Sequence, residues 1–164
     1  MIKWICTLFI AIIAISQANG NEMKNFSDLQ NIAEQIVRER AYDPQQLAVI
    51  LSTSFDMLDD DLPNHFRYKA KIEGGELFSA CDLRAPKTNQ ATSAILICDV
   101  IGEAIDGKLV TEAYGESVQF KPAQPSAPPT AHHYLSVQFD NAELSFGVDQ
   151  KSDKIKSMVI NFNL

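Results

Sequence analysis

The sequence predicts an α+β fold, in which an N-terminal helical pair packs on a curved antiparallel β-meander of about six to seven strands. Two observations support this fold class. Over about residues 27–61 the apolar positions recur with the spacing of a helix face. From about residue 65 to residue 163 apolar and polar positions alternate, and turn residues separate the runs.

The first twenty residues have the pattern of a secretory signal peptide. Lys3 precedes an apolar run over residues 4–15, and small or polar residues follow up to Gly20. We expect cleavage after Ala18 or Gly20, which leaves residues 21–164 as a single domain of ordinary size. The alternative is a retained membrane anchor, but the run is shorter than the roughly twenty residues that span a bilayer. We therefore expect the protein in the periplasm or outside the cell, without a permanent membrane span.

The chain is acidic. Its formal net charge is −7, and residues 21–66 contain nine acidic residues against three basic ones. Nucleic acids and anionic membrane surfaces need a basic contact face, so neither is an expected partner. A basic protein partner suits the helical half, although a solvated acidic face explains the same composition.

Two helices are expected before residue 62. Ser27 and Gln30 form a capping-box pattern for a helix that ends near Arg40. Its apolar face is Leu29, Ile32, Ala33, Ile36 and Val37. Asp43 and Pro44 predict the start of the second helix. Its apolar stripe is Leu47, Ile50, Leu51, Ser54, Met57 and Leu58, and it ends at Asp59, Asp60, Asp61 and Pro63.

The first predicted strand has one apolar and one basic face. Its apolar positions Phe66, Tyr68, Ala70 and Ile72 alternate with the basic positions His65, Arg67, Lys69 and Lys71. A two-residue turn at Gly74 and Gly75 follows. This turn places Tyr68 opposite Cys81 on one side of the sheet.

Cys81 and Cys98 are the two cysteines of the mature chain, and we expect them to form a disulfide. Pairing them across the next hairpin brings Leu83 opposite Leu96, so all four residues share one face. A free reactive thiol or a metal pair is the alternative. No histidine lies at zinc-ligand spacing from them, and redox pairs are usually closer in sequence. The expected role is therefore structural, namely to fix the strand register.

Asp106 and Gly107 predict a tight turn between strands at residues 93–105 and 108–120. Both faces of these strands are apolar, which requires cover on both sides. The helical pair covers one face, and either a curled sheet or an apolar small molecule covers the other. The residues expected to line such a ligand cavity are Tyr114, Phe120, Ile97 and Ile101.

A proline-rich loop over residues 121–131 precedes the last three strands. Docking to a proline-reading domain and a stiff surface loop both fit this composition. Residues 133–139 and 142–148 are expected to pair around a two-residue turn, with His133 opposite Val148. The last strand covers residues 155–164.

Charged residues on both sides of residue 62 form the candidate interaction surface. They are His65, Arg67, Lys69 and Lys71 on the first strand and Asp59, Asp60 and Asp61 at the end of the second helix. The basic row suits an acidic partner. It also fits the protection of an edge strand or the neutralisation of the acidic helices. The aspartates lack the ligand spacing of a calcium loop and fit a solvated helix end.

The sequence contains no recognisable catalytic motif. His132 and His133 point to opposite faces of a strand, so they do not easily chelate one metal. We expect no cofactor and no metal. The leading hypothesis is an exported binding module that acts by protein–protein contact, as inhibitors, immunity proteins and envelope adaptors do. A carrier of an apolar ligand is the second hypothesis, and a small hydrolase that uses His65 or His133 is the third.

Overall fold

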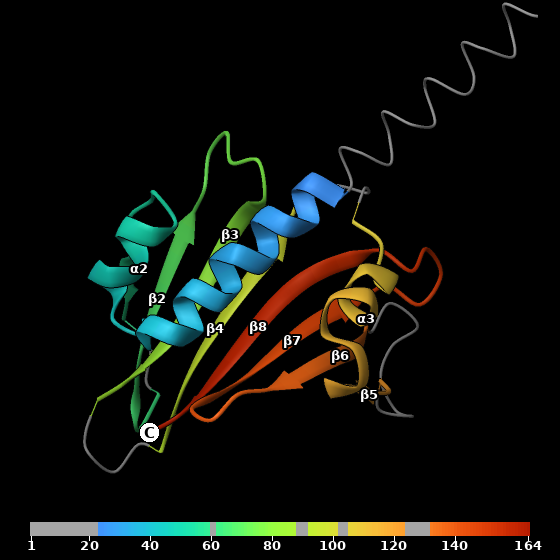
Figure 1. Cartoon of the computed structure of the whole chain (residues 1–164). Coiled ribbons are helices and arrows are strands. Elements are labelled where there is room, and N and C mark those ends of the chain that lie inside the picture. Colours follow the sequence, from blue (N-terminus) through green and yellow to red (C-terminus); the bar gives the residue numbers. More distant parts are fainter. Residues whose placement is uncertain (1–22, 60–61, 88–91, 102–104, 124–131) are drawn as a thin grey trace, which may run out of the picture.

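The computed structural model describes residues 23–59, 62–87, 92–101, 105–123 and 132–164. In this part of the chain three α-helices lie on one eight-stranded sheet (Figure 1). The predicted α+β class, with an N-terminal helical pair on an antiparallel sheet, is confirmed. The sheet has eight strands in place of the expected six to seven.

The sheet consists of two four-stranded meanders that meet between β4 and β8, because the strand order is β1-β2-β3-β4-β8-β7-β6-β5. Every neighbouring pair is antiparallel. The strands are β1 (Asp56–Leu58), β2 (His65–Lys71), β3 (Phe78–Pro86), β4 (Ser93–Val100), β5 (Val118–Lys121), β6 (His133–Gln138), β7 (Ala142–Val148) and β8 (Ile155–Asn163).

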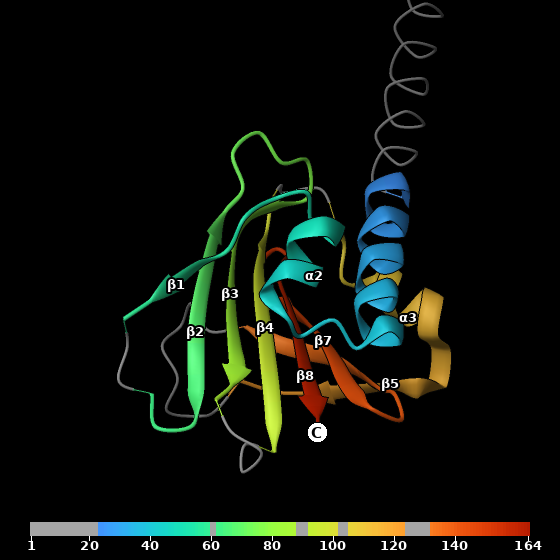
Figure 2. The same cartoon turned by 90° about the vertical axis from the view of Figure 1, so that its left-hand side faces the viewer.

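The N-terminal helix (residues 23–39) lies across the concave side of the bent sheet, and α2 and α3 flank it on the same side (Figures 1 and 2). Its buried positions Phe26, Leu29, Ala33, Ile36 and Val37 form one face, as the spacing predicts. The opposite face of the sheet carries no helix of the described chain (Figure 2). The sheet therefore has one helix-covered face and one face without a described helix, which we call the open face.

The second helix is shorter than the sequence suggests. Helix α2 (Pro44–Ile50) begins at Asp43, whose Oδ1 accepts hydrogen bonds from the backbone N–H groups of Gln45 and Gln46. It ends before Ser52, whose φ is +49°. The predicted helical residues Met57 and Leu58 instead belong to β1, because pairing with Tyr68 and Arg67 of β2 satisfies their backbone.

The predicted strand over residues 108–120 is wrong. Residues Lys108–Tyr114 form α3, a 3₁₀ turn (Gly115–Ser117) follows, and only Val118–Lys121 form a strand, β5. Val110 and Tyr114 are four residues apart, so their apolar spacing fits a helix as well as a strand. Because α3 intervenes, β4 pairs with β8 rather than with the next segment of the chain.

The cysteine hairpin is confirmed in detail. Cys81 pairs with Cys98 and Leu83 with Leu96, and the two sulfurs are bonded. Both half-cystines are buried on the helix-covered face. The predicted pairing of His133 with Val148, around the turn at Asp140 and Asn141, is also confirmed.

The first hairpin is shifted by two residues from the expected register. Tyr68 lies opposite Leu83, and Ala70 lies opposite Cys81. The connection is longer than a two-residue turn, because the N–H of Ile72 bonds the carbonyl of Ser79 at 2.9 Å. A shift of two keeps every side chain on its predicted face.

Candidate functional site

The predicted basic row lies on the open face of the sheet, where Asp82 of the neighbouring strand contacts one of its members, Arg67. Arg67 donates from Nε and Nη2 to Oδ2 of Asp82 at 2.8 and 2.7 Å. Nε of Arg84 lies 3.9 Å from Oδ1 of the same carboxylate. Asp82 therefore pairs closely with Arg67 and lies near Arg84, and its single negative charge offsets only one of the two guanidinium charges. Asp82 is not among the predicted site residues, although its alternation with Cys81 and Leu83 along the strand places it on the basic face.

The ends of the row also have partners within the chain. Nε2 of His65 hydrogen-bonds the carbonyl of Ser93 at 2.9 Å, and Nζ of Lys71 lies 3.0 Å from Oε1 of Glu73. Lys69 has no ion pair in the described residues. The outer strand is β1, but it pairs only with Arg67–Lys69, so among the described residues both ends of the row lie along the edge of the sheet. Asp59 is exposed just after β1, whereas Asp60 and Asp61 lie outside the described residues.

The four residues expected to line an apolar cavity lie apart. Tyr114 packs at 6.5 Å between ring centroids from Phe146, on the helix-covered face. Ile97 pairs with Val159 on the open face. Phe120 is largely exposed beside His133, and Ile101 is partly exposed after β4. The structure therefore gives no support to a cavity built from this set.

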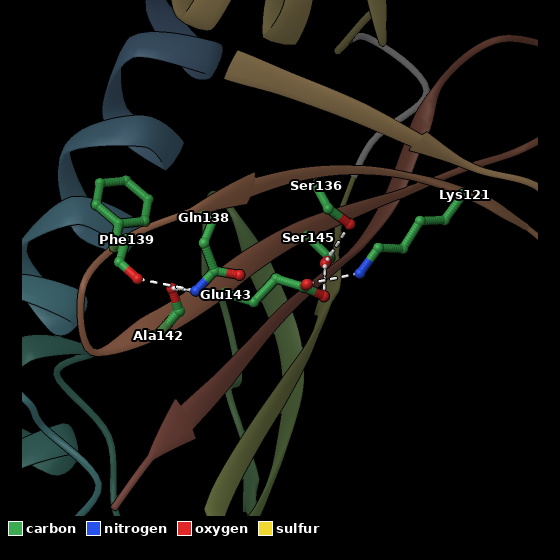
Figure 3. Close-up of polar contacts among 7 residues, drawn as sticks. All are labelled: Lys121, Ser136, Gln138, Phe139, Ala142, Glu143 and Ser145. Atoms are coloured by element: carbon green, nitrogen blue, oxygen red, sulfur yellow. Dashed lines mark hydrogen bonds and ion pairs between the residues drawn. The ribbon is translucent and has the colours of Figure 1, made fainter.

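Polar contacts on the open face link the strands of the second meander (Figure 3). The hydroxyls of Ser136 and Ser145 lie 2.7 Å apart, and Ser145 donates to Glu143 at 3.3 Å. Lys121 in turn donates to the Glu143 carboxylate at 2.5 Å. Both serines are buried, and the carboxylate is neutralised by the lysine. This arrangement joins β5, β6 and β7 and does not resemble an activated nucleophile.

His133, one of the two histidines considered as a catalytic residue, packs beside an aromatic side chain. The His133 ring lies 5.1 Å from the ring of Phe120 between centroids. Within the described residues no group of three or more histidine, cysteine, aspartate or glutamate side chains is arranged to hold a metal ion.

A groove that the sequence analysis did not anticipate lies between the N-terminal helix, the end of α2 and the loop between β2 and β3. Its volume is about 360 Å³, and it is open to solvent. Figure 2 shows this loop above α2. We call it the acidic groove. It is lined by Asn25, Asp28, Ile32, Ile50, Leu51, Ser52, Phe78 and residues 72–77.

The floor of the acidic groove is aliphatic. Ile32, Ile50, Ile72 and Leu77 are only partly buried and pack against the core. They come from three separate segments of the chain. The helix and strand periodicities of the sequence describe each segment alone and do not predict that these residues lie together. Each residue looks like an ordinary partly buried position of its own segment, and only the tertiary fold brings the four side chains together.

The rim of the acidic groove carries three carboxylates, Asp28, Glu73 and Glu76. Glu73 pairs with Lys71, and both side chains are about four-fifths exposed. Asp28 and Glu76 form no ion pair with any residue that the structure describes. The rim therefore has an excess of negative charge above an apolar floor.

Comparison with known protein families, with curated proteins and with solved structures gives no match. No helix among the described residues has the length and apolar character that a bilayer span requires. Any functional assignment must therefore come from the surfaces described above.

Proposed function

We propose that the protein is an exported binding module that acts by protein–protein contact, with the acidic groove as its contact surface. The observation that carries this proposal is the juxtaposition of partly buried aliphatic side chains and unpaired carboxylates in one open groove. Apolar contact supplies affinity, while the charged rim guides encounter and partner choice.

Two further features are compatible with export. The Cys81–Cys98 disulfide is the kind of bond that persists in an oxidising compartment. The leader pattern at residues 1–20 supplies the route out of the cytoplasm. The carrier hypothesis has less support, because Tyr114 and Ile97 lie on opposite faces of the sheet.

The experiment is site-specific photo-crosslinking in cells that express the full chain. A photoreactive residue replaces Ser52 or Glu76 at the groove, or Glu112 or Gln119 as exposed controls on α3 and β5. We expect an adduct with one protein from both groove positions and not from the controls. Equal adducts from all four positions, or none from the groove, would refute the proposal. Correct export and disulfide formation of each variant are checked by mass.

A further inference from the structure

The aliphatic floor and the carboxylate rim of the acidic groove indicate which kind of partner side chains would bind there. Resting on the function proposed above, we infer that the groove binds a protein segment in which an aliphatic side chain is flanked by lysine or arginine. The aliphatic side chain occupies the floor, and the basic groups meet the carboxylates of the rim.

The floor determines the apolar part of the segment. Ile32, Ile50, Ile72 and Leu77 present branched aliphatic surface that the fold leaves partly exposed. Covering this surface with another aliphatic side chain removes apolar area from water on both partners. The floor has no aromatic side chain that is open to stacking, because Phe78 is buried. An aliphatic side chain is therefore the best match in the described groove.

The rim determines the charged part. Asp28, Glu73 and Glu76 surround the floor, and Lys71 is the one cation that contacts any of them in the described residues. The Lys71–Glu73 pair is solvent-exposed, and such pairs contribute little, so Glu73 can exchange its partner readily. A basic segment is thus attracted and an acidic one repelled.

The loop that carries two of the carboxylates is held in shape. Gly74 has a φ of +70°, which glycine tolerates best. A Cβ on Gly75 would lie 2.5 Å from the carbonyl oxygen of Phe78 and 2.7 Å from Cγ2 of Ile72. The carbonyl of Leu77 also accepts a 2.7 Å hydrogen bond from the N–H of Ile101. Glu73 and Glu76 are therefore presented by an anchored loop, which reduces the entropy lost on binding.

Other occupants fit less well. Anionic membrane surfaces are repelled by the same carboxylates that attract a basic segment. A volume of about 360 Å³ is near the lower end of small-molecule sites, and the groove is open rather than enclosed. A few side chains of a larger partner match this size and shape.

The test uses the mature chain and short synthetic peptides that each contain a central leucine. In the first peptide lysines flank the leucine, in the second glutamates replace the lysines, and in the third serine replaces the leucine. Binding is measured by NMR chemical-shift titration, which also reports the position of each contact. We expect the lysine–leucine peptide to shift the signals of Ile72 and Leu77, and the other two peptides to bind at least about tenfold more weakly.

A charge-matched pair of variants tests the rim. E73Q/E76Q removes two exposed carboxylates from the groove, whereas E112Q/E116Q removes two exposed carboxylates from α3 and the following turn. The groove variant should bind the lysine–leucine peptide about three- to tenfold more weakly, and the control should bind like the parent chain. Raising the salt concentration from about 0.05 M to about 0.5 M should weaken binding by the parent more than binding by the groove variant, which keeps only Asp28 of the three rim carboxylates.

Several results would overturn the inference. These are tighter binding of the glutamate peptide, equal effects of the two charge variants, and signal shifts outside the groove. Binding of anionic vesicles at the groove without peptide binding would also overturn it. If groove-specific cross-links still form in cells, the proposed function survives and only the chemistry of the segment is wrong. If cross-links also fail, the function itself is wrong.

Discussion

The phenol hydroxyl of Tyr114 donates a 3.0 Å hydrogen bond to Oε1 of Glu34, across 80 residues of sequence. The same carboxylate oxygen accepts a 2.9 Å hydrogen bond from Nε2 of Gln30. The Tyr114 ring packs near Phe146 of the sheet. One aromatic side chain therefore joins α3, which connects the two meanders, to both the N-terminal helix and the core.

Replacing this tyrosine by phenylalanine should weaken the connection without creating a large cavity. Y114F removes the hydroxyl, while Glu34 keeps its bond to Gln30. We expect the free energy of unfolding to fall by about 1.5–3 kcal/mol, the usual range for a lost hydrogen bond to a charged group. Urea denaturation measures this change. Q35A, which removes a bond between exposed Gln35 and Glu39 on the same helix, is the control and should change little.

The same contact should make the stability depend on alkaline pH. Burial, reinforced by the hydrogen bond to Glu34, raises the pKa of Tyr114 above its ordinary value of 10.0. The folded state therefore holds this proton more tightly than the unfolded state. Its contribution to stability is complete below pH 10 and decreases as pH rises through the folded-state pKa. The stability difference between the parent chain and Y114F, measured by urea denaturation, should shrink above pH 10. A constant difference would contradict this linkage.

The parts of the fold that the sequence predicts well are those that local pairing determines. The hairpin that joins β3 to β4 is correct because a disulfide between Cys81 and Cys98 and the alternating apolar positions require the same register. The prediction for the hairpin at Asp140 and Asn141 is also correct, because a two-residue turn allows few alternative strand registers. In both cases neighbouring segments contain enough information to fix the pairing.

The errors concern contacts that are distant in sequence. Val110 and Tyr114 fit either a helix or a strand, and the choice depends on the pairing of β4 with β8, more than 50 residues away. The acidic groove has the same origin, because Ile32, Ile50 and Leu77 meet only in the folded chain. The basic row follows from alternation along one strand, but the pairing of Arg67 with Asp82 depends on the exact register between β2 and β3.

The disulfide should contribute strongly to stability. It joins residues 17 positions apart on neighbouring strands. A closed loop of this length stabilises a protein by about 3 kcal/mol on the chain-entropy model. We expect a chain that is unfolded, reduced and refolded under reducing conditions to lose about this much unfolding free energy, as measured by urea denaturation. Reductant should leave the stability of C81A/C98A unchanged, and an equal effect on both chains would show that the disulfide is not the cause.

Gly147 should not tolerate a larger residue, because neighbouring side chains already fill the space beside its Cα atom. A Cβ there would overlap Oγ of Ser157 and would lie 3.1 Å from Cε1 of Tyr134 and 3.3 Å from Nδ1 of His132. We expect G147A to lower the free energy of unfolding by about 1–3 kcal/mol, the usual cost of overpacking. The measurement is urea denaturation of the single and double variants. Because the nearest atom is the Ser157 hydroxyl, adding S157A should recover part of the loss. A double variant as unstable as the sum of its single variants would show that this hydroxyl is not what excludes the methyl group.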